Sequence, residues 1–176
     1  MATAVDRTRP AIFLDRDGVL NVDRGYVHRI EDFAWLPGAI DAIKIANERD
    51  WLVFVVTNQS GVARGLYGEE QVRRLHEHMQ RELRRHGAHI DDFRYCPYHP
   101  DATVAKYAQA STWRKPEPGM ILDLLEHWPV DRARSIVIGD KQIDLEAARA
   151  AGLRGVLVGG ANLAELIDRL ITPSSR

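Results

Sequence analysis

The 176-residue chain has little of several features that mark particular classes of protein. It holds one cysteine, Cys96, so an internal disulfide is excluded. Its longest apolar run, WLVFVV at 51–56, is far shorter than the ~20 residues needed to cross a bilayer. The first residues, MATAVDRTRP, lack the apolar stretch of a secretory signal. We therefore expect a cytoplasmic protein with no membrane contact.

An excess of charge of one sign is also missing. The 24 basic and 25 acidic side chains leave a formal net charge of −1, and no long run of one sign forms a nucleic-acid patch. Because no basic patch surrounds Trp51, Trp113 and Trp128, we expect them to be packing residues and not a platform for stacking bases. The sequence therefore predicts no nucleic-acid partner.

The apolar residues that are present indicate an α/β fold. Short apolar runs alternate with stretches of helical period, which is typical of a parallel sheet covered by helices on both faces. The expected strands are 11–14, 51–57, 93–96, 135–139 and 154–159, and the expected helices are 38–50, 69–87, 118–128, 142–152 and 161–171. We predict a Rossmann-like, doubly wound parallel sheet in three layers, with residues 1–176 as a single domain and a monomer.

The expected helix at 69–87 carries an apolar stripe and a stop signal. The stripe consists of Val72, Leu75, Met79 and Leu83, and Gly87 fits the position just after the last turn. His76 and His78 suggest a metal site, but residues two apart point to different faces of a helix. We expect both histidines on the solvated face.

Polar residues follow three of the expected strands, where ligands bind in doubly wound sheets. Asp15 and Asp17 follow the first strand, and Asp140 and Asp144 follow the strand at 135–139. If these strands adjoin, four carboxylates meet at one edge. Two carboxylates ~4 Å apart repel by ~4 kcal/mol at an effective dielectric near 20, so the cluster needs a cation. Hard oxygen ligands indicate Mg²⁺.

Phosphate-binding groups surround the predicted cation site. Thr57 offers a hydroxyl, the turn NQSG at 58–61 offers backbone N–H groups, and Lys115 offers a cation just before a helix. The chain has no Walker A sequence, which disfavours a kinase or GTPase, so we expect the protein itself to attack the phosphoryl group. Each piece alone also fits ordinary turns and caps, but the ordered set DRDGV, VTNQSG, RKP and GDKQID favours a catalytic site.

That ordered set resembles the haloacid dehalogenase-like (HAD-like) superfamily of aspartyl-phosphate phosphohydrolases. Longer stretches, FLDRDGVLNVDRGYVHRIEDF, VVTNQSGVARG, CPYHP and RKPEPGM, are similar to the D-glycero-D-manno-heptose 1,7-bisphosphate phosphatases, which are related to the histidinol-phosphatase branch. The similarity covers residues 11 to about 158. It implies Mg²⁺-dependent hydrolysis of one phosphate of a small phosphorylated sugar, the heptose bisphosphate, through an aspartyl-phosphate intermediate.

The resemblance also implies roles for individual residues. Asp15 would be the nucleophile, and Asp17 would act first as acid and then as base. Mg²⁺ would be held by the Asp15 carboxylate, the Asp17 backbone carbonyl and Asp140, with Asp144 supporting. Thr57 and Lys115 would bind the transferring phosphoryl oxygens. The expected substrate-binding residues are Asn58, Gln59, Ser60, Arg64, Arg114 and Lys141. Of these, Arg64 is our candidate for the second phosphate, with a surface salt bridge as its alternative role.

The family varies in the cap that covers the site. Here the segment after the first strand is too short to form a domain, so we expect an open site without a large cap. Substrate choice would then depend on three loops, 21–37, 61–65 and 97–114. The alternative substrates are histidinol phosphate or another small metabolite. A receiver-type signalling module is the alternative from another class, although the DxD spacing favours turnover over storage of the phosphate.

In the relatives, the loop corresponding to 96–113 commonly carries a structural Zn²⁺ on a Cys-x-His pair and a Cys-x-Cys pair. This chain keeps Cys96, and His99 is the one nearby substitute for the missing histidine. Other residue types stand at the remaining positions: Tyr98, Ser111 and Trp113. Two ligands are too few for a structural zinc site, so we expect none. The loop would instead be held by aromatic side chains with polar tips: Tyr98, Tyr107 and Trp113.

Overall fold

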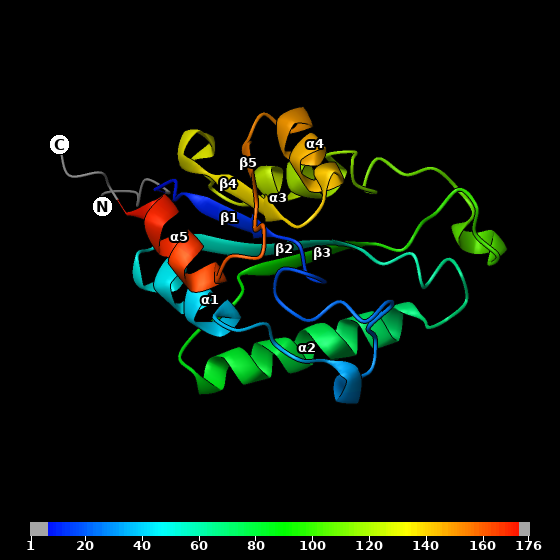
Figure 1. The fold of residues 1–176 in the computed structure, drawn as a ribbon. Helices are drawn as coiled ribbons and strands as arrows, with labels where there is room; N and C mark the ends of the chain where they lie inside the picture. Colours follow the sequence, from blue (N-terminus) through cyan, green and yellow to red (C-terminus); the bar gives the residue numbers. More distant parts are fainter. Residues whose placement is uncertain (1–6, 173–176) are drawn as a thin grey trace, which may run out of the picture.

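Five parallel strands form the centre of the computed structural model, which describes residues 7–172 (Figure 1). Their spatial order is β3-β2-β1-β4-β5. The central strand β1 pairs Ile12 with Val53 on one side and with Ile136 on the other. The predicted strands are confirmed with small shifts at their ends: β1 (Ala11–Leu14), β2 (Leu52–Asn58), β3 (Asp92–Cys96), β4 (Ile136–Gly139) and β5 (Arg154–Leu157).

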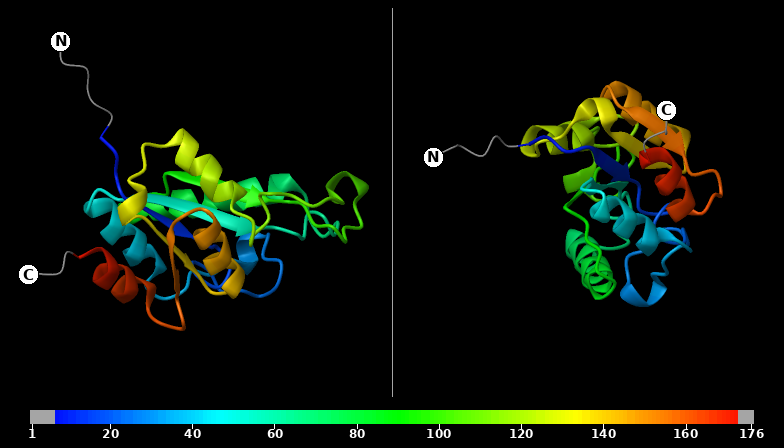
Figure 2. Two further views of the ribbon diagram at one scale, coloured as in Figure 1. Left: turned by 90° about the horizontal axis from the view of Figure 1, so that it is seen from above. Right: turned by 90° about the vertical axis from the view of Figure 1, so that its left-hand side faces the viewer.

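Helices cover both faces of this sheet, so the predicted three-layer fold is confirmed. Figures 1 and 2 show α1, α2 and α5 on one side of the sheet and α3 and α4 on the other. No helix within residues 7–172 combines the length and apolar character needed to span a bilayer. The five helices are α1 (Ala39–Glu48), α2 (Glu69–Arg85), α3 (Gly119–His127), α4 (Gln142–Ala150) and α5 (Leu163–Ile171).

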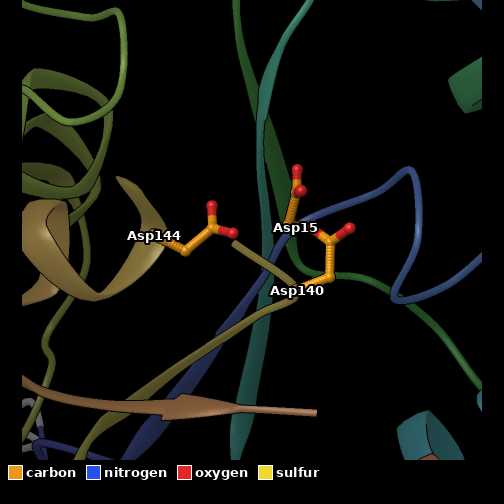
Figure 3. A group of neighbouring side chains, drawn as sticks. All are labelled: Asp15, Asp140 and Asp144. Atoms are coloured by element: carbon orange, nitrogen blue, oxygen red, sulfur yellow. The ribbon is translucent and has the colours of Figure 1, made fainter. Parts of the chain in front are cut away.

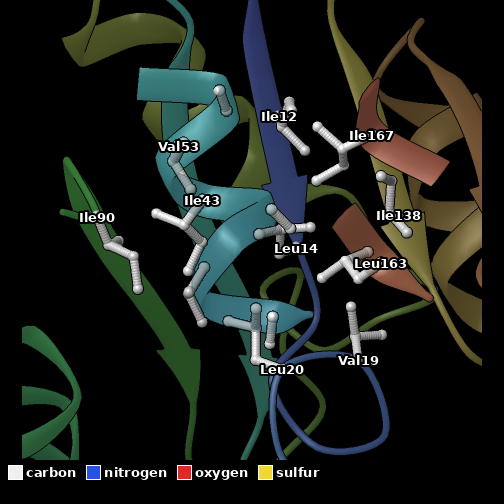
Figure 4. Packing of buried hydrophobic residues seen from close by; sticks show 14 of the residues in the cluster. Ile12, Leu14, Val19, Leu20, Ile43, Val53, Ile90, Ile138, Leu163 and Ile167 are labelled. Carbon is white, nitrogen blue, oxygen red and sulfur yellow. The ribbon is translucent and has the colours of Figure 1, made fainter. Parts of the chain in front are cut away.

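The strands are continuously apolar because both faces of each central strand are buried. Side chains alternate along β1, so Ile12 and Leu14 pack among residues of α1 and α5 (Figure 4), and Phe13 packs on the opposite face, toward α3 and α4. Complete burial of each such side chain is worth about 1.5–3 kcal/mol. Together these two cores fix β1 and thereby the place where it ends.

Helix α2 is the one element where the sequence prediction was partly wrong. The stripe of Val72, Leu75, Met79 and Leu83 is buried, and Gly87 has a φ of +71° just beyond the helix, as predicted. His76 is not on the solvated face, because it is 6% exposed and stacks on Phe93 with ring centroids 4.6 Å apart. The reason is geometric: position 76 lies one turn after Val72, inside an apolar face broader than the stripe alone. His78 is half-buried.

Two irregular connections lie beyond the carboxyl ends of the strands. Residues 21–37 hold only one short 3₁₀ turn, Ile30–Asp32, and no inserted domain. Residues 97–115 extend away from the sheet (Figure 2) and hold a second 3₁₀ turn, Ala105–Tyr107. There Tyr107 packs at 5.8 Å from Tyr98 and donates its O–H to Glu69 at 2.7 Å. The packing predicted for these two tyrosines is present, and that it holds the loop stays a prediction.

The tryptophans pack as expected. Trp128 lies 5.5 Å from Phe54 and donates its N–H to Asp92 at 3.1 Å. Trp113 packs against the core on the α3 side of the sheet, and Trp51 packs against the core on the α1 side. The indole rings are therefore used in the fold, which agrees with the absence of a basic patch around them in the sequence.

Candidate active site

The carboxyl ends of β1, β2 and β4 meet at the point where the strand order reverses. After β1 the chain builds β2 and β3 outward on one side, and it later builds β4 and β5 outward on the other. Ligands bind beyond the strands at such a switch point. A pocket of about 290 Å³ lies there. Most of the predicted site residues line it: Asp15, Asp17, Thr57, Asn58, Gln59, Ser60, Arg114, Lys115 and Lys141.

Three carboxylates converge beside this pocket (Figure 3). Asp15 follows β1, Asp140 follows β4, and Asp144 lies in the first turn of α4. One oxygen of each lies within 4.8 Å of the others. Oxygen Oδ1 of Asp140 is buried and has no hydrogen-bond partner among the described residues. Such a group costs free energy unless something binds it, and three hard oxygen donors fit a divalent cation.

A buried lysine holds two of these carboxylates together. Lys115 is 3% exposed, and its Nζ lies 2.9 Å from Asp15 and 2.7 Å from Asp144. The ammonium also donates to the carbonyl oxygen of Val56 at 2.9 Å. Burial alone would lower the pKa of Lys115, but the two carboxylates raise it above its ordinary value. Lys115 is therefore a permanent cation, and two carboxylates and a carbonyl oxygen surround its ammonium.

For Asp15, burial outweighs the effect of the opposite charge on the pKa. The pKa of its carboxyl is raised from 3.8 to about 6, because burial and the negative charges of Asp144 and Asp17 outweigh the lowering effect of the Lys115 ammonium. The backbone N–H of Arg16 also donates to Asp15 at 2.8 Å. The side chain is thus ionised at neutral pH and held at two points.

Asp144 is positioned by the start of α4. Its Oδ2 accepts from the backbone N–H of Lys141 at 3.0 Å in a capping box, while its Oδ1 accepts from Lys115. Both oxygens are therefore engaged by the protein. Asp140 sits against the turn after β1, because a Cβ on Gly18 would lie 2.3 Å from its Oδ2. Gly18 also has a φ of +83°, so a glycine is required there for two reasons.

The carboxylate of Asp17 accepts more hydrogen bonds from the protein than those of Asp15, Asp140 and Asp144. The guanidinium of Arg16 donates to both of its oxygens, at 3.1 and 3.0 Å. The side-chain amides of Asn21 and Gln59 donate to one oxygen each, at 3.0 and 3.1 Å. Its side chain remains 20% exposed at the pocket. Asp17 is therefore fixed in orientation but open to a ligand.

Two residues predicted to bind substrate use their amides inside the protein. Gln59 is buried, donates to Thr57 Oγ1 at 2.9 Å as well as to Asp17, and accepts from the hydroxyl of Tyr67 at 2.7 Å. Asn58 donates to the backbone carbonyl of Lys115 and accepts from its N–H, both at 3.0 Å. These side chains position Thr57 and Lys115. Because both residues follow a strand, the sequence predicts that they lie near the site. It does not predict the direction in which each side-chain amide points.

Three more of the predicted residues form the outer wall of the pocket. Ser60, Arg114 and Lys141 line the pocket, and Lys141 lies 3.7 Å from Asp23. Arg64 is exposed and does not line the pocket, and it forms no ion pair within residues 7–172. Burial, and next to it the Arg64 charge, lowers the pKa of Arg114. Nη1 of Arg114 is buried without a partner among the described residues. The two guanidinium groups therefore create a positive region beside the pocket.

Several residues at the site were missed in the sequence analysis. Tyr26, from the 21–37 loop, lines the pocket with 46% of its surface exposed and an unusual φ of +53°. Tyr67 closes the wall beside Gln59. The fully buried Arg16 stood between two singled-out aspartates and was not assigned a role. The loop 21–37 contributes to the wall of the pocket, but nothing in its composition selected Tyr26.

The zinc prediction concerns the neighbouring loop. Cys96 is buried, with its Sγ 3.9 Å from the carbonyl oxygen of Tyr98. Nδ1 of His99 accepts from the backbone N–H of Asp101 at 3.1 Å. In the part of the chain that the structure describes, three or more carboxylate, histidine or cysteine groups converge only at Asp15, Asp140 and Asp144. That no structural zinc binds to this loop stays a prediction.

Comparison with known proteins gives a consistent picture. A HAD-hydrolase-like family model matches residues 112–172. The D-glycero-beta-D-manno-heptose-1,7-bisphosphate 7-phosphatase of Rhodopseudomonas palustris is 48% identical over 174 residues, which is 99% of this chain and 97% of the relative. The enzyme of that name from Escherichia coli K12 is 44% identical and covers 82% of this chain and 75% of its own. A D,D-heptose 1,7-bisphosphate phosphatase from B. bronchiseptica, solved with magnesium and phosphate, superimposes with a TM-score of 0.81 at 34% identity, over 92% of this chain and 98% of its own.

Proposed function

The chain belongs to the HAD-like phosphatase family, and from that premise we propose that it removes the C7 phosphate of D-glycero-D-manno-heptose 1,7-bisphosphate. The names of its relatives support this substrate and this position. The observation that carries the proposal is the group of three carboxylates and a buried lysine at the switch point of the sheet. This arrangement suits a negatively charged phosphoryl group held beside an ionised carboxylate.

Mg²⁺ is the cation that fits this site best. The ligands would be the carboxylates of Asp15 and Asp140 and the backbone carbonyl of Asp17, with Asp144 in support. The unpartnered oxygen of Asp140 supports this assignment, as does the magnesium in the B. bronchiseptica structure. When bound, Mg²⁺ offsets the charge of the carboxylates and of the phosphoryl oxygens.

The first half of the reaction would transfer the phosphoryl group to the protein. An oxygen of Asp15 attacks phosphorus, the bond between phosphorus and the sugar oxygen breaks, and Asp17 gives its proton to that oxygen. Thr57 and Lys115 hold the phosphoryl oxygens and offset their charge. The Lys115 ammonium donates to Val56 and Asp144 and pairs with Asp15 here, so one N–H group turns to the phosphoryl group when substrate binds.

The second half would release inorganic phosphate. Asp17, now ionised, takes a proton from water as the water oxygen attacks phosphorus, and the bond to the Asp15 oxygen breaks. Asp15 returns as a carboxylate and Asp17 as an acid. One side chain thus serves as acid and base in turn, which is why it has to be held in one orientation at the pocket.

The second phosphate of the substrate would bind at the outer wall. Arg114, with its unpartnered Nη1, is supported as a ligand by its place in the pocket, and Arg64 adds positive charge beside it. Lys141 and Tyr26 would contact the sugar. We further propose that residues 1–176 act as one phosphatase domain and as a monomer, since all the residues assigned above come from this chain.

A substrate panel tests this function. Purified protein with Mg²⁺ is assayed for phosphate release from heptose 1,7-bisphosphate, histidinol phosphate and other small phosphomonoesters. We expect kcat/KM for the heptose bisphosphate to exceed the others by about a hundredfold, the discrimination that a few specific polar contacts supply. Phosphorus NMR of the product shows which phosphate was lost. Equal weak rates on the heptose and histidinol compounds contradict the assignment.

A further inference from the structure

The side chain of Arg16 is completely buried beside the site, although it is charged. Asp15 and Asp17 both line the pocket, whereas the side chain of Arg16, between them, is buried on another side of the turn. That side is covered by the loop 21–37 and by α2, which supply its neighbours Val27 and His76. A guanidinium in such a place needs acceptors for its N–H groups.

The guanidinium finds its one counter-charge on Asp17. Nη2 donates to both oxygens of Asp17, at 3.0 and 3.1 Å, and to the carbonyl oxygen of Val27 at 2.6 Å. Within residues 7–172, no other carboxylate forms an ion pair with Arg16. One nitrogen therefore joins the Asp17 carboxylate to the loop 21–37.

His76 supports the guanidinium from behind without adding charge. Nη1 of Arg16 lies 3.4 Å from Nε2 of His76, and because a guanidinium only donates, Nε2 must accept and the ring proton must sit on Nδ1. Burial, reinforced by the Arg16 cation, holds the pKa of His76 well below its usual range. The ring is fixed by stacking on Phe93 at 4.6 Å. A neutral, immobile histidine thus limits where the guanidinium can lie.

The other donors to Asp17 differ from Arg16 in kind. Asn21 and Gln59 are neutral amides, and each reaches a single oxygen. Arg16 alone contacts both oxygens, through one nitrogen that lies between them, and among the described residues it is the only charged donor, so it limits how the carboxylate can turn. We propose that Arg16 is the positioning residue for Asp17 and that it sets the direction in which Asp17 delivers its proton. This inference rests on the proposed role of Asp17 as acid and base.

If Arg16 had a purely structural role, its replacement would affect all substrates equally. Substrates with different leaving groups therefore distinguish this role from the positioning of Asp17. A misplaced acid slows the hydrolysis of phosphate esters whose leaving oxygen needs a proton. It has little effect on the hydrolysis of esters of an acidic phenol. We therefore compare kcat/KM for phenyl phosphate and for 4-nitrophenyl phosphate, at saturating Mg²⁺, in the full-length protein. Their ratio is independent of the fraction of folded protein, so a destabilised variant remains informative.

Four single variants and one double variant complete the experiment. Arg16→Met should lower the phenyl to nitrophenyl ratio by about tenfold or more, part of the 10²–10⁴ that general acid catalysis contributes, and Arg16→Lys should recover part of the loss. Leu83→Ala, a cavity in α2 away from the pocket, should destabilise the protein without changing the ratio. Asp17→Asn should lower the ratio by itself. Adding Arg16→Met to Asp17→Asn should lower it no further, since Arg16 acts through Asp17.

The outcomes separate the inference from the function on which it rests. If Asp17→Asn lowers the ratio but Arg16→Met leaves it at the wild-type value, the positioning role is wrong and the proposed mechanism survives. If Asp17→Asn itself leaves the ratio unchanged, Asp17 is not the acid, and both proposals are overturned. Equal effects of Arg16→Met and Leu83→Ala on the ratio also contradict the positioning role.

Discussion

The most unusual residue environment in the protein is the buried cation that two carboxylates share. Lys115 pairs with both Asp15 and Asp144. One positive charge is thus shared by two carboxylates, and it offsets the burial of each less than a separate cation would. Burial therefore still raises the pKa of Asp15, to about 6. A carboxylate in this condition is ionised at neutral pH yet poorly stabilised, which suits a nucleophile that gives up its charge on forming a bond to phosphorus.

Replacement of the proposed nucleophile tests this interpretation directly. Asp15→Asn keeps the shape of the side chain but removes the attacking oxygen, so kcat should fall by more than about a hundredfold. Circular dichroism should show an unchanged fold, because no buried apolar volume is lost. Retention of more than about a hundredth of the activity would mean that Asp15 does not form a covalent intermediate.

The proposed acid and base should have a different mutational signature. Asp17→Asn should slow hydrolysis of the sugar phosphate by about 10²–10⁴-fold, the range for loss of general acid–base catalysis. With 4-nitrophenyl phosphate, whose leaving group needs little help, the phosphoenzyme should form and then persist. Rapid-quench measurement should show a burst of nitrophenol close to one per active site, and a linear time course without a burst contradicts the role.

At this scale the sequence predicted which residues gather but not how each is held. The acids Asp15, Asp17 and Asp140 follow strand ends, and parallel strands bring such positions together whatever the details of packing. The amide of Gln59 turns inward to Thr57, and its direction depends on Tyr67, eight residues later, which no local pattern specifies. Arg16 was missed for the same reason, because its partner His76 comes from a distant helix.

Among the secondary-structure elements, prediction succeeded where both faces of an element are buried. Strands such as β1 and β2 are apolar throughout, so their existence is visible without knowledge of their neighbours. The buried face of α2 was underestimated, since a histidine can be buried as a neutral stacked ring. The loops 21–37 and 97–114 were placed correctly as irregular segments, but their conformations depend on single contacts that composition does not reveal.

The long loop 97–114 offers a test of how such contacts hold an irregular element. Tyr107→Ala removes both the ring packed on Tyr98 and the hydroxyl bonded to Glu69. Trypsin should then cleave after Lys106 about tenfold faster, which corresponds to about 1.4 kcal/mol less free energy for local opening. Tyr107→Phe keeps the ring and serves as the matched control, with a smaller increase. Equal cleavage rates in all three proteins would show that the loop is held elsewhere.

The turn after β1 is a second element with a specific requirement. Gly18→Ala places a Cβ 2.3 Å from Oδ2 of Asp140 at a φ of +83°. The Asp140 carboxylate must move, so the Mg²⁺ concentration for half-maximal activity should rise by about tenfold, since metal affinity depends on ligand placement. Gly152→Ala has a similar φ, +74°, but open space around its Cβ, and it controls for backbone strain alone. A normal Mg²⁺ requirement in Gly18→Ala contradicts the assignment of Asp140 as a ligand.

For the molecule as a whole, the site is a local excess of negative charge in a nearly neutral protein. The net charge is −1, yet three carboxylates converge at one edge of the sheet with a single buried lysine among them. Folding without a cation must therefore bring like charges together and take them out of water. The stability of the whole fold should consequently report on the state of this site.

The pH dependence of unfolding makes that link measurable in metal-free protein. The folded state raises the pKa of Asp15 from 3.8 to about 6, so between these values it holds a proton that the unfolded chain has lost. The free energy of unfolding should then fall as pH rises through this window, and the loss is complete above about pH 6. The side chain introduced by Asp15→Asn cannot ionise, so this pH-dependent loss of stability is absent from the variant. The two proteins should therefore be nearly equally stable near pH 4. At pH 7 the variant should be more stable by up to about 3 kcal/mol, the equivalent of roughly two pKa units.

Mg²⁺ should reverse that order, and this reversal is the decisive part of the measurement. A cation that binds only the folded wild type adds about 2.7 kcal/mol at a hundred times its Kd, whereas Asp15→Asn has lost a proposed ligand and should gain less. Urea unfolding at pH 4 and pH 7, with chelator or with millimolar Mg²⁺, supplies the four comparisons. Shifted carboxyls that do not interact with Asp15, such as Glu69, cancel in the difference between the two proteins, because both chains contain them. Parallel pH curves for wild type and variant in chelator would show that Asp15 is not destabilised by burial, and an equal gain from Mg²⁺ in both would show that Asp15 does not hold the cation.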